Sequence, residues 1–138
     1  MSFYYLASPY SHKDPEVGKA RFDQTEKATY WLLWNKYWVY SPIIHNHEIS
    51  NKYKMPTDAG FWWGYNQAML ERASGLYILL IDGWKDSIGL KKELVFALER
   101  KIPIRGIEPK GWAGFQFDSA DWRLTGQVGQ STAGVERV

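Results

Sequence analysis

The 138-residue chain contains no cysteine, and this absence excludes a disulfide framework and a thiolate metal site. It also has no apolar run approaching the ~20 residues that a membrane-spanning helix requires. Its first residues show no basic segment followed by a long apolar stretch, so we expect no secretory signal. Together these absences predict a cytoplasmic protein without a membrane partner.

A large excess of charge of one sign is also missing. The chain has 17 Lys and Arg against 15 Asp and Glu, and its net charge is +2. Nucleic-acid surfaces usually need a clustered basic stripe, which is absent, so we expect no nucleic-acid partner. The glycine-rich dinucleotide fingerprint, the P-loop and the Gly-x-Ser-x-Gly elbow are absent as well, and we expect no cofactor.

Aromatic side chains, in contrast, are abundant: the chain has 8 Trp, 9 Tyr and 6 Phe. With 45% hydrophobic residues, the composition is typical of a globular domain. Two interpretations of the aromatic residues remain open and are compatible with each other. The rings can form a core or a subunit interface, and some of them can line a pocket for a flat ligand such as a nucleobase.

The order of strand-like and helix-like segments predicts an α/β fold. Strands are expected at residues 3–7, 37–41, 76–81 and 102–107, and helices at residues 15–36, 58–73 and 88–100. This alternation predicts an open parallel sheet of four to five strands with helices on both faces, Rossmann-like or flavodoxin-like in type.

Three further segments complete this prediction. Residues 43–56 are expected to be irregular, and residues 112–117 to contain a short edge strand. Residues 126–138 are rich in Gly, Gln, Ser and Thr and are expected to form a flexible tail. A single domain is therefore predicted over residues 1–125.

Ligands of open α/β sheets bind outside the carboxyl ends of the strands. That rule selects three loops, at residues 7–13, 41–56 and 82–87. The loops contain much of the reactive inventory of the chain: His12, His45, His47, Ser8, Ser11, Ser41, Asp82, Asp86 and Ser87. This coincidence favours an enzyme over a scaffold.

The third loop leads into a helix whose first turns carry the clearest candidate chemistry. Ser87 is a good N-cap, and Gly89 and Glu93 then share one face of the helix, one turn apart. Glycine at position 89 leaves room for the carboxylate to face the crevice, although a glycine inside a helix costs ~1 kcal/mol relative to alanine. The alternative is that Gly89 allows the helix to pack closely on the sheet and that Glu93 is a solvated surface residue.

The start of the same helix offers free N–H groups and the positive end of the helix dipole, which together form an anion site. Ser8 and Ser11, on the neighbouring loop, could add hydroxyl donors. A phosphate held there would lie within reach of Glu93. The alternative is that Ser87 only caps the helix.

The His45-Asn46-His47 segment has the spacing of a metal-binding strand. A site would form only if the fold brought these His together with Glu48 and Asp58, so we predict no metal. We expect instead a hydrogen-bonding or stacking role for one of the two histidines.

Two of these motifs resemble a known family. Tyr4-Tyr5-Leu6-Ala7-Ser8-Pro9-Tyr10, together with Ser87-x-Gly89-x-x-x-Glu93, resembles the nucleoside 2-deoxyribosyltransferase superfamily. The similarity covers about residues 3–107. It is closest to a small uncharacterised branch with a Ser-Pro-Tyr-Ser-His segment and a Gly-Trp-x-Asp-Ser turn, near the deoxynucleoside 5′-monophosphate N-glycosidases.

The resemblance implies roles for particular residues. Glu93 would attack the anomeric carbon, and Tyr5 would orient its carboxylate. The transferases carry Asp at the position of Ser87, whereas the nucleotide hydrolases carry Ser there and use it to bind the 5′-phosphate. The sugar-binding Asp of the family is absent, so Asn66 or Gln67 would replace it.

Family members are usually dimers or larger homo-oligomers, and the Trp62-Trp63 pair would suit such an interface. The resemblance therefore implies a homo-oligomer whose only other partner is a small-molecule nucleoside or nucleotide.

The sequence therefore predicts an N-glycosidase that cleaves the base–sugar bond of a (deoxy)nucleoside 5′-monophosphate through a covalent intermediate on Glu93. Asp86 or Asp82 would protonate the leaving base. The predicted substrate-binding residues are Ser8, Tyr10, Ser11, His47, Asn66, Trp84, Ser87 and Gly89. Two alternatives remain open, a deoxyribosyltransferase that exchanges bases and a non-catalytic nucleotide-binding or regulatory module.

Overall fold

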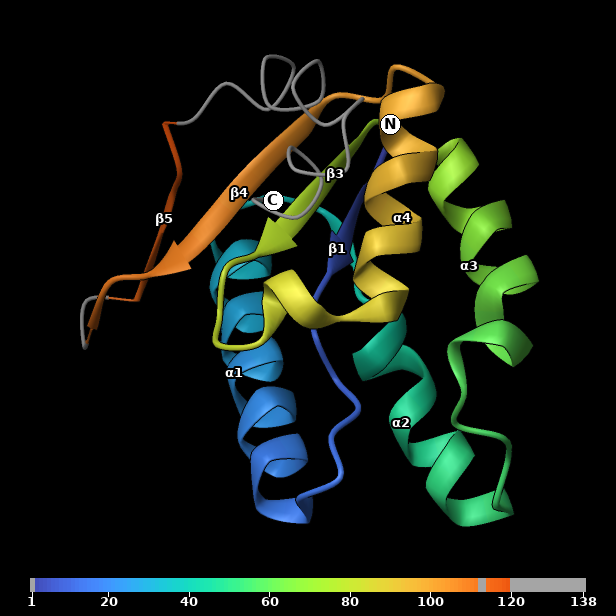
Figure 1. Cartoon of the computed structure of the whole chain (residues 1–138). Helices are drawn as coiled ribbons and strands as arrows, with labels where there is room; N and C mark the ends of the chain where they lie inside the picture. Colours follow the sequence, from blue (N-terminus) through green and yellow to red (C-terminus); the bar gives the residue numbers. More distant parts are fainter. Residues whose placement is uncertain (1, 112–113, 120–138) are drawn as a thin grey trace.

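Five strands form one open sheet in the order β2-β1-β3-β4-β5 (Figure 1). The structure is a computed structural model that describes residues 2–111 and 114–119. The strands are β1 (Tyr4–Ala7), β2 (Val39–Tyr40), β3 (Gly75–Leu79), β4 (Ile104–Pro109) and β5 (Phe115–Phe117). The first four are parallel, and β5 pairs antiparallel with β4. The predicted open α/β sheet is confirmed.

Helices cover both faces of this sheet (Figure 1). They are α1 (Pro15–Trp34), α2 (Pro42–Tyr53), α3 (Ala59–Arg72) and α4 (Ile88–Glu99), and a short 3₁₀ turn, η1 (Trp84–Asp86), precedes α4. On one face, Ala28 and Leu32 of α1 pack in a buried cluster with Leu6 and Leu79 of the sheet. The second buried cluster lies on the opposite face, under α3 and α4.

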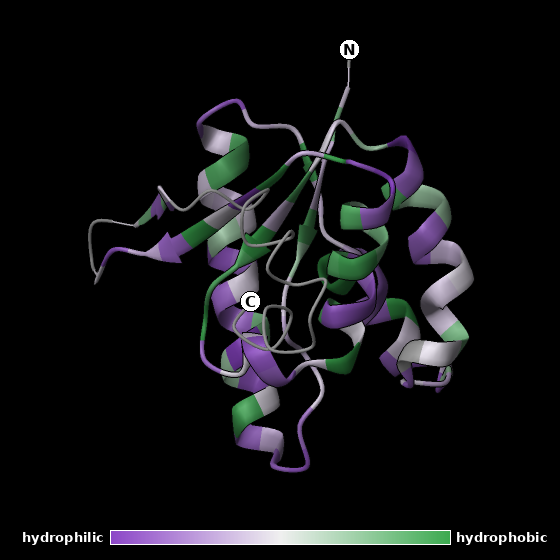
Figure 2. Ribbon diagram, turned by 45° about the horizontal axis from the view of Figure 1, so that its top comes forward, coloured by the Kyte–Doolittle hydropathy of each residue, from purple (hydrophilic) through white to green (hydrophobic). Residues whose placement is uncertain are grey.

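That second cluster joins Leu70 of α3 and Leu90 and Leu94 of α4 to Tyr5 and Ile78. All five residues of β3 are buried, because helices cover both sides of this strand. Figure 2 shows the result, with hydrophobic residues gathered along the central strands while the helices mix hydrophobic and hydrophilic positions. The continuous apolar run of residues 76–81 in the sequence predicts such a central strand, and the structure confirms it.

A side-chain cap begins each α-helix in the described part of the chain. Asp14, Ser41, Asp58 and Ser87 each accept a hydrogen bond from a backbone N–H of the first turn. The cap predicted at Ser87 is confirmed.

The prediction that residues 43–56 are irregular is wrong, because most of this segment forms α2. Ser41 caps the helix and Pro42 occupies its first turn, where a proline costs nothing because its missing N–H would be unpaired. In the sequence Pro42 indicates only the end of the strand at residues 37–41, whereas in the structure it is also the first residue of a helix. His45 and His47 consequently project about 200° apart around a helix axis instead of sharing one side of a strand.

Helical spacing predicts that Phe61, Tyr65, Ala68 and Met69 form the inner face of α3. Met69 does pack against the buried cluster, but Phe61, Tyr65 and Ala68 are exposed, whereas Leu70 is fully buried. Trp63 packs edge-on against Phe96 of α4. The reason is that α3 packs beside α4 rather than flat on the sheet.

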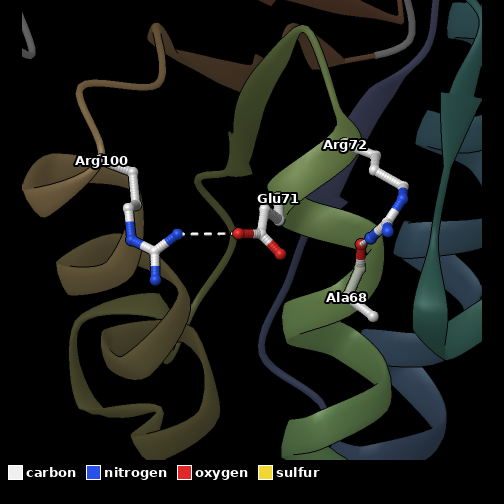
Figure 3. Close-up of polar contacts among 4 residues, drawn as sticks. All are labelled: Ala68, Glu71, Arg72 and Arg100. Carbon is white, nitrogen blue, oxygen red and sulfur yellow. Dashed lines mark hydrogen bonds and ion pairs between the residues drawn. The ribbon is translucent and has the colours of Figure 1, made fainter.

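An ion pair also joins these two helices. Arg100 donates to Glu71 at 2.9 Å, while Arg72 turns back to the Ala68 carbonyl oxygen of its own helix at 3.0 Å (Figure 3). Both side chains of the ion pair are about half exposed, so this contact orients the helices more than it stabilises them.

The predicted tail, residues 126–138, lies outside the described residues, as do positions 112 and 113 of the predicted edge strand. Within the described chain, each helix is too short or too polar to cross a membrane.

Candidate active site

A cavity of about 610 Å³ opens at the carboxyl ends of β1, β2 and β3. Its walls come from the loop after β1, from α2 and the start of α3, and from the stretch after β3 that leads into α4. These are the three loops that the sequence selected. Cavities of about 300–1,000 Å³ are typical of small-molecule sites. The sheet edge therefore gathers residues from distant parts of the chain around one ligand-sized space.

Glu93 lies in the wall of this cavity, one helical turn after Gly89, which also lines it. Glu93 is only 5% exposed, and its Oε2 accepts a hydrogen bond from the hydroxyl group of Tyr5, a residue 88 positions away on β1. Tyr5 does not line the cavity and reaches it through Glu93. The solvated surface position considered for Glu93 is therefore not what the fold builds.

The ionisation of this pair follows from its burial. Burial raises the pKa of Glu93 from 4.5 to about 7, and the hydrogen bond from Tyr5 opposes part of that rise. Burial, followed by the adjacent Glu93, raises the pKa of Tyr5 far above its usual value. Tyr5 therefore keeps its proton and acts as a donor. A carboxyl group that titrates near neutrality in a cavity wall is suited to nucleophilic or acid–base chemistry.

Serine hydroxyl groups line the cavity near the start of α4. Ser87 caps that helix, accepting from the Leu90 N–H at 3.2 Å, and it also lines the cavity. Ser8 is buried, and its Oγ has no hydrogen-bond partner among the described residues. Ser11 also lines the cavity and is exposed. The three predicted serines therefore all line this one cavity.

We expect the change Ser87→Ala to lower the free energy of unfolding by about 1 kcal/mol, because the Leu90 N–H loses its acceptor at the N-terminus of α4. Urea unfolding followed by circular dichroism measures this loss. The matched variant Ser87→Asp keeps a capping oxygen and should remain within about 0.5 kcal/mol of the wild type. Equal losses in both variants would contradict a capping role.

Tyr10 and His47 form a second polar pair in the cavity wall. The Tyr10 hydroxyl group lies 2.7 Å from Nδ1 of His47, and Nε2 of the same ring lies 3.1 Å from the amide nitrogen of Asn51. The His47 ring stacks on Phe22 of α1, with ring centroids 3.9 Å apart. Burial raises the pKa of Tyr10, so its hydroxyl group stays protonated. The prediction of a hydrogen-bonding, stacked histidine fits the placement of His47.

Asn66 and Asp86 also line the cavity. Asn66 Oδ1 is buried without a hydrogen-bond partner in the described chain, so it can accept a bond from a ligand hydroxyl group. Asp86 is exposed at the rim, and Asp82, the other candidate proton donor, is not part of the lining.

Trp84, predicted to bind substrate, and His45 do not line the cavity. Trp84 packs against the buried cluster under α3 and α4, and Lys85 sits over its ring. His45 is exposed and its ring contacts Tyr40 and Tyr65. Among residues 2–111 and 114–119, no three His, Cys, Asp or Glu side chains gather in a way that could hold a metal ion.

The sequence did not single out Arg21 of α1 or Lys92 of α4, both of which line the cavity. Asp58, considered only as part of a metal site, lines it as well. Trp62 and Trp63, expected at a subunit interface, are half-buried and also line it. No local pattern identifies Arg21, which lies inside a long helix. Its contribution depends entirely on how α1 is placed against the loops.

A family model matches most of the chain. The model of a family described as "Domain of unknown function (DUF1937)" matches residues 2–108, which contain nearly all of the elements and the whole lining of the cavity. No curated protein matches the chain.

Proposed function

We propose a function from the cavity itself, because the chain belongs to the DUF1937 family and that membership assigns no chemistry. The protein is an N-glycosidase that cleaves the base–sugar bond of a nucleoside 5′-monophosphate. One observation carries this proposal: a buried carboxyl group, Glu93, stands in the wall of a ligand-sized cavity and is held by the hydroxyl group of Tyr5.

The resemblance to the nucleoside 2-deoxyribosyltransferase superfamily supports the same chemistry. That resemblance implies a Glu nucleophile at position 93 and an orienting Tyr at position 5. These two residues lie on different elements, α4 and β1, and they form a direct hydrogen bond. The resemblance was drawn from sequence motifs alone, so the contact between Tyr5 and Glu93 in the structure is an independent observation that supports it.

The reaction would proceed in two steps. Ionised Glu93 attacks C1′, the new Oε–C1′ bond forms as the C1′–N bond breaks, and the electron pair of the broken bond stays on the base. Asp86, at the cavity rim, is the candidate donor of the proton that the leaving nitrogen takes up. Water then attacks C1′, releases the Glu93 carboxylate and returns a proton to Asp86.

The serine hydroxyl groups support a phosphorylated substrate. Ser8 and Ser87 both line the cavity, and Ser87 caps the N-terminus of α4, where backbone N–H groups and the helix dipole favour an anion. A phosphate bound there would anchor the nucleotide and place C1′ relative to Glu93.

A non-catalytic nucleotide-binding module is the second candidate. It is favoured by Asn66, a neutral amide where the resemblance implies an Asp that holds the sugar. A binding module would keep the cavity and the phosphate contacts but would release no base.

We expect purified protein incubated with a panel of nucleoside and deoxynucleoside 5′-monophosphates to release free base from at least one of them, because Glu93 can attack C1′. Chromatography of the reaction mixtures measures the base. Addition of a second free base distinguishes transfer, which would yield a new nucleotide, from hydrolysis, which would not. Nucleotide binding without base release from any member of the panel would support the binding module and sink the enzymatic proposal.

A further inference from the structure

Arg21 lies at the meeting point of two cavity loops. Its side chain extends from α1, Nη1 donates to the Ser11 carbonyl oxygen at 2.9 Å, and the residue lines the cavity. The guanidinium group rests directly against Gly83 in the turn after β3. A Cβ atom added at Gly83 would lie 2.0 Å from Nη2 of Arg21. The guanidinium group therefore bridges the loops that follow β1 and β3.

Most of the hydrogen-bonding capacity of this group is unused. A guanidinium group has five N–H donors, and only Nη1 has a hydrogen-bond acceptor among the described residues. Nε is buried without a partner, and Arg21 forms no ion pair with any carboxylate in the described part of the chain. Buried donors and charges normally have partners, so a half-buried arginine in this state indicates an absent anionic ligand.

Ser8 gives a second, independent indication at the same place. It is only 7% exposed, it lines the same cavity, and its Oγ has no hydrogen-bond partner in the described chain. A hydroxyl group left buried and unpaired costs free energy that a ligand oxygen would offset. A cation without an ion-pair partner and an unpaired hydroxyl group thus line the same cavity.

We propose that Arg21 and Ser8 form the subsite for a phosphomonoester, which makes Arg21 the residue that selects nucleotides over nucleosides. This inference rests on the proposed function and adds to it the residue that determines specificity. The planar guanidinium group can donate two parallel hydrogen bonds to two phosphate oxygens, which a point charge cannot do. Ser87 and the N-terminus of α4 would complete the subsite from the opposite side.

Gly83 contributes to this subsite because its lack of a side chain leaves room for the Arg21 guanidinium group. Its φ of 93° lies in the left-handed region, and the guanidinium group occupies the volume that a side chain would fill. Gly83→Ala therefore displaces Arg21 without changing any charge, although it also strains the turn because a side chain rarely adopts this φ. It serves as a second variant that tests the position of the guanidinium group rather than its presence.

The kinetic test compares a nucleoside 5′-monophosphate with the corresponding nucleoside. We expect Arg21→Gln to lower kcat/KM for the nucleotide about 10- to 100-fold, in line with the loss of a hydrogen bond to a charged group, and to leave kcat/KM for the nucleoside nearly unchanged. Gly83→Ala should reproduce this selective loss. Lys19→Gln removes the same charge from an exposed position of the same helix and should change neither value. Equal losses for both substrates would overturn the proposal.

A binding measurement tests the subsite without requiring catalysis. We expect inorganic phosphate to raise the thermal unfolding midpoint of the wild type, compared with chloride at equal ionic strength, and not to raise that of Arg21→Gln. If the wild type releases no base but shows this difference, the proposed function fails and the anion subsite stands. If phosphate stabilises both proteins equally, or neither, the subsite is wrong even where base release is observed.

Discussion

Replacement of Glu93 by glutamine should abolish base release, lowering kcat by about 10⁴-fold or more, as expected when a covalent nucleophile is removed. The amide has nearly the shape of the carboxyl group and its oxygen can still accept the hydrogen bond from Tyr5. The fold should therefore be retained, as circular dichroism and thermal unfolding would show. Glu99→Gln makes the same change at an exposed position near the end of α4 and should leave kcat unchanged. Base release by Glu93→Gln at the wild-type rate would contradict the mechanism.

The same variant tests the burial of the carboxyl group through its stability. In the folded chain Glu93 holds its proton up to about pH 7, whereas in the unfolded chain it loses it near pH 4.5. The stability that this group contributes is therefore full below about pH 4.5, falls as the pH rises to about 7, and stays low above that. Relative to Glu93→Gln, the wild type should lose about 3 kcal/mol over this interval, since each pKa unit corresponds to about 1.4 kcal/mol. A flat difference would show that Glu93 is solvated.

Removal of the Tyr5 hydroxyl group should have the next largest effect, and its signature is a displaced pH profile. The wild-type rate should rise with pH around a midpoint near 7, because only ionised Glu93 can attack. Tyr5 lowers the pKa of Glu93 by donating to the carboxylate, so Tyr5→Phe raises it. A hydrogen bond to a charged group is worth about 1.5–3 kcal/mol, which moves the midpoint up by about one to two pH units.

The rate at pH 7, where about half of the wild-type Glu93 is ionised, should consequently fall about 5- to 50-fold, with recovery at higher pH. Tyr77→Phe provides the matched control, since Tyr77 is also a buried tyrosine of the sheet but belongs to the cluster on the α1 face. It should leave the midpoint of the pH profile where it is. A loss in Tyr5→Phe that is the same at every pH would show that Tyr5 does not act by setting the ionisation of Glu93.

Features that depend on neighbours in the chain could be predicted well. Ser87 was predicted to cap a helix because a serine oxygen satisfies N–H groups only two or three positions ahead. The central position of β3 follows from its continuous apolar run. A strand needs apolar side chains at every position only when helices cover both of its faces. The edge at which the cavity opens followed from the order of strands and helices, because parallel strands place all of their carboxyl ends together.

The errors have a different origin. The segment that forms α2 contains His, Asn, Ile and Ser, which have modest helix propensity, and Pro42 is its only buried residue. Contact with α1, including the stacking of His47 on Phe22, stabilises the helix, and no pattern within the segment reports that contact. The inner face of α3 was displaced for the same reason, since packing beside α4 selected which side chains became buried.

For Glu93, the sequence by itself determined its place on a helix, one turn after a glycine and beside the carboxyl ends of the strands. Local chain geometry is sufficient for that much. Only the tertiary structure decided that the carboxyl group is buried, that Tyr5 donates to it across 88 residues, and that Arg21 rests against Gly83 beside an unpaired Ser8. Burial, shifted pKa values and unpaired donors arise from contacts between distant segments, and those contacts exist only once the sheet has brought the segments together.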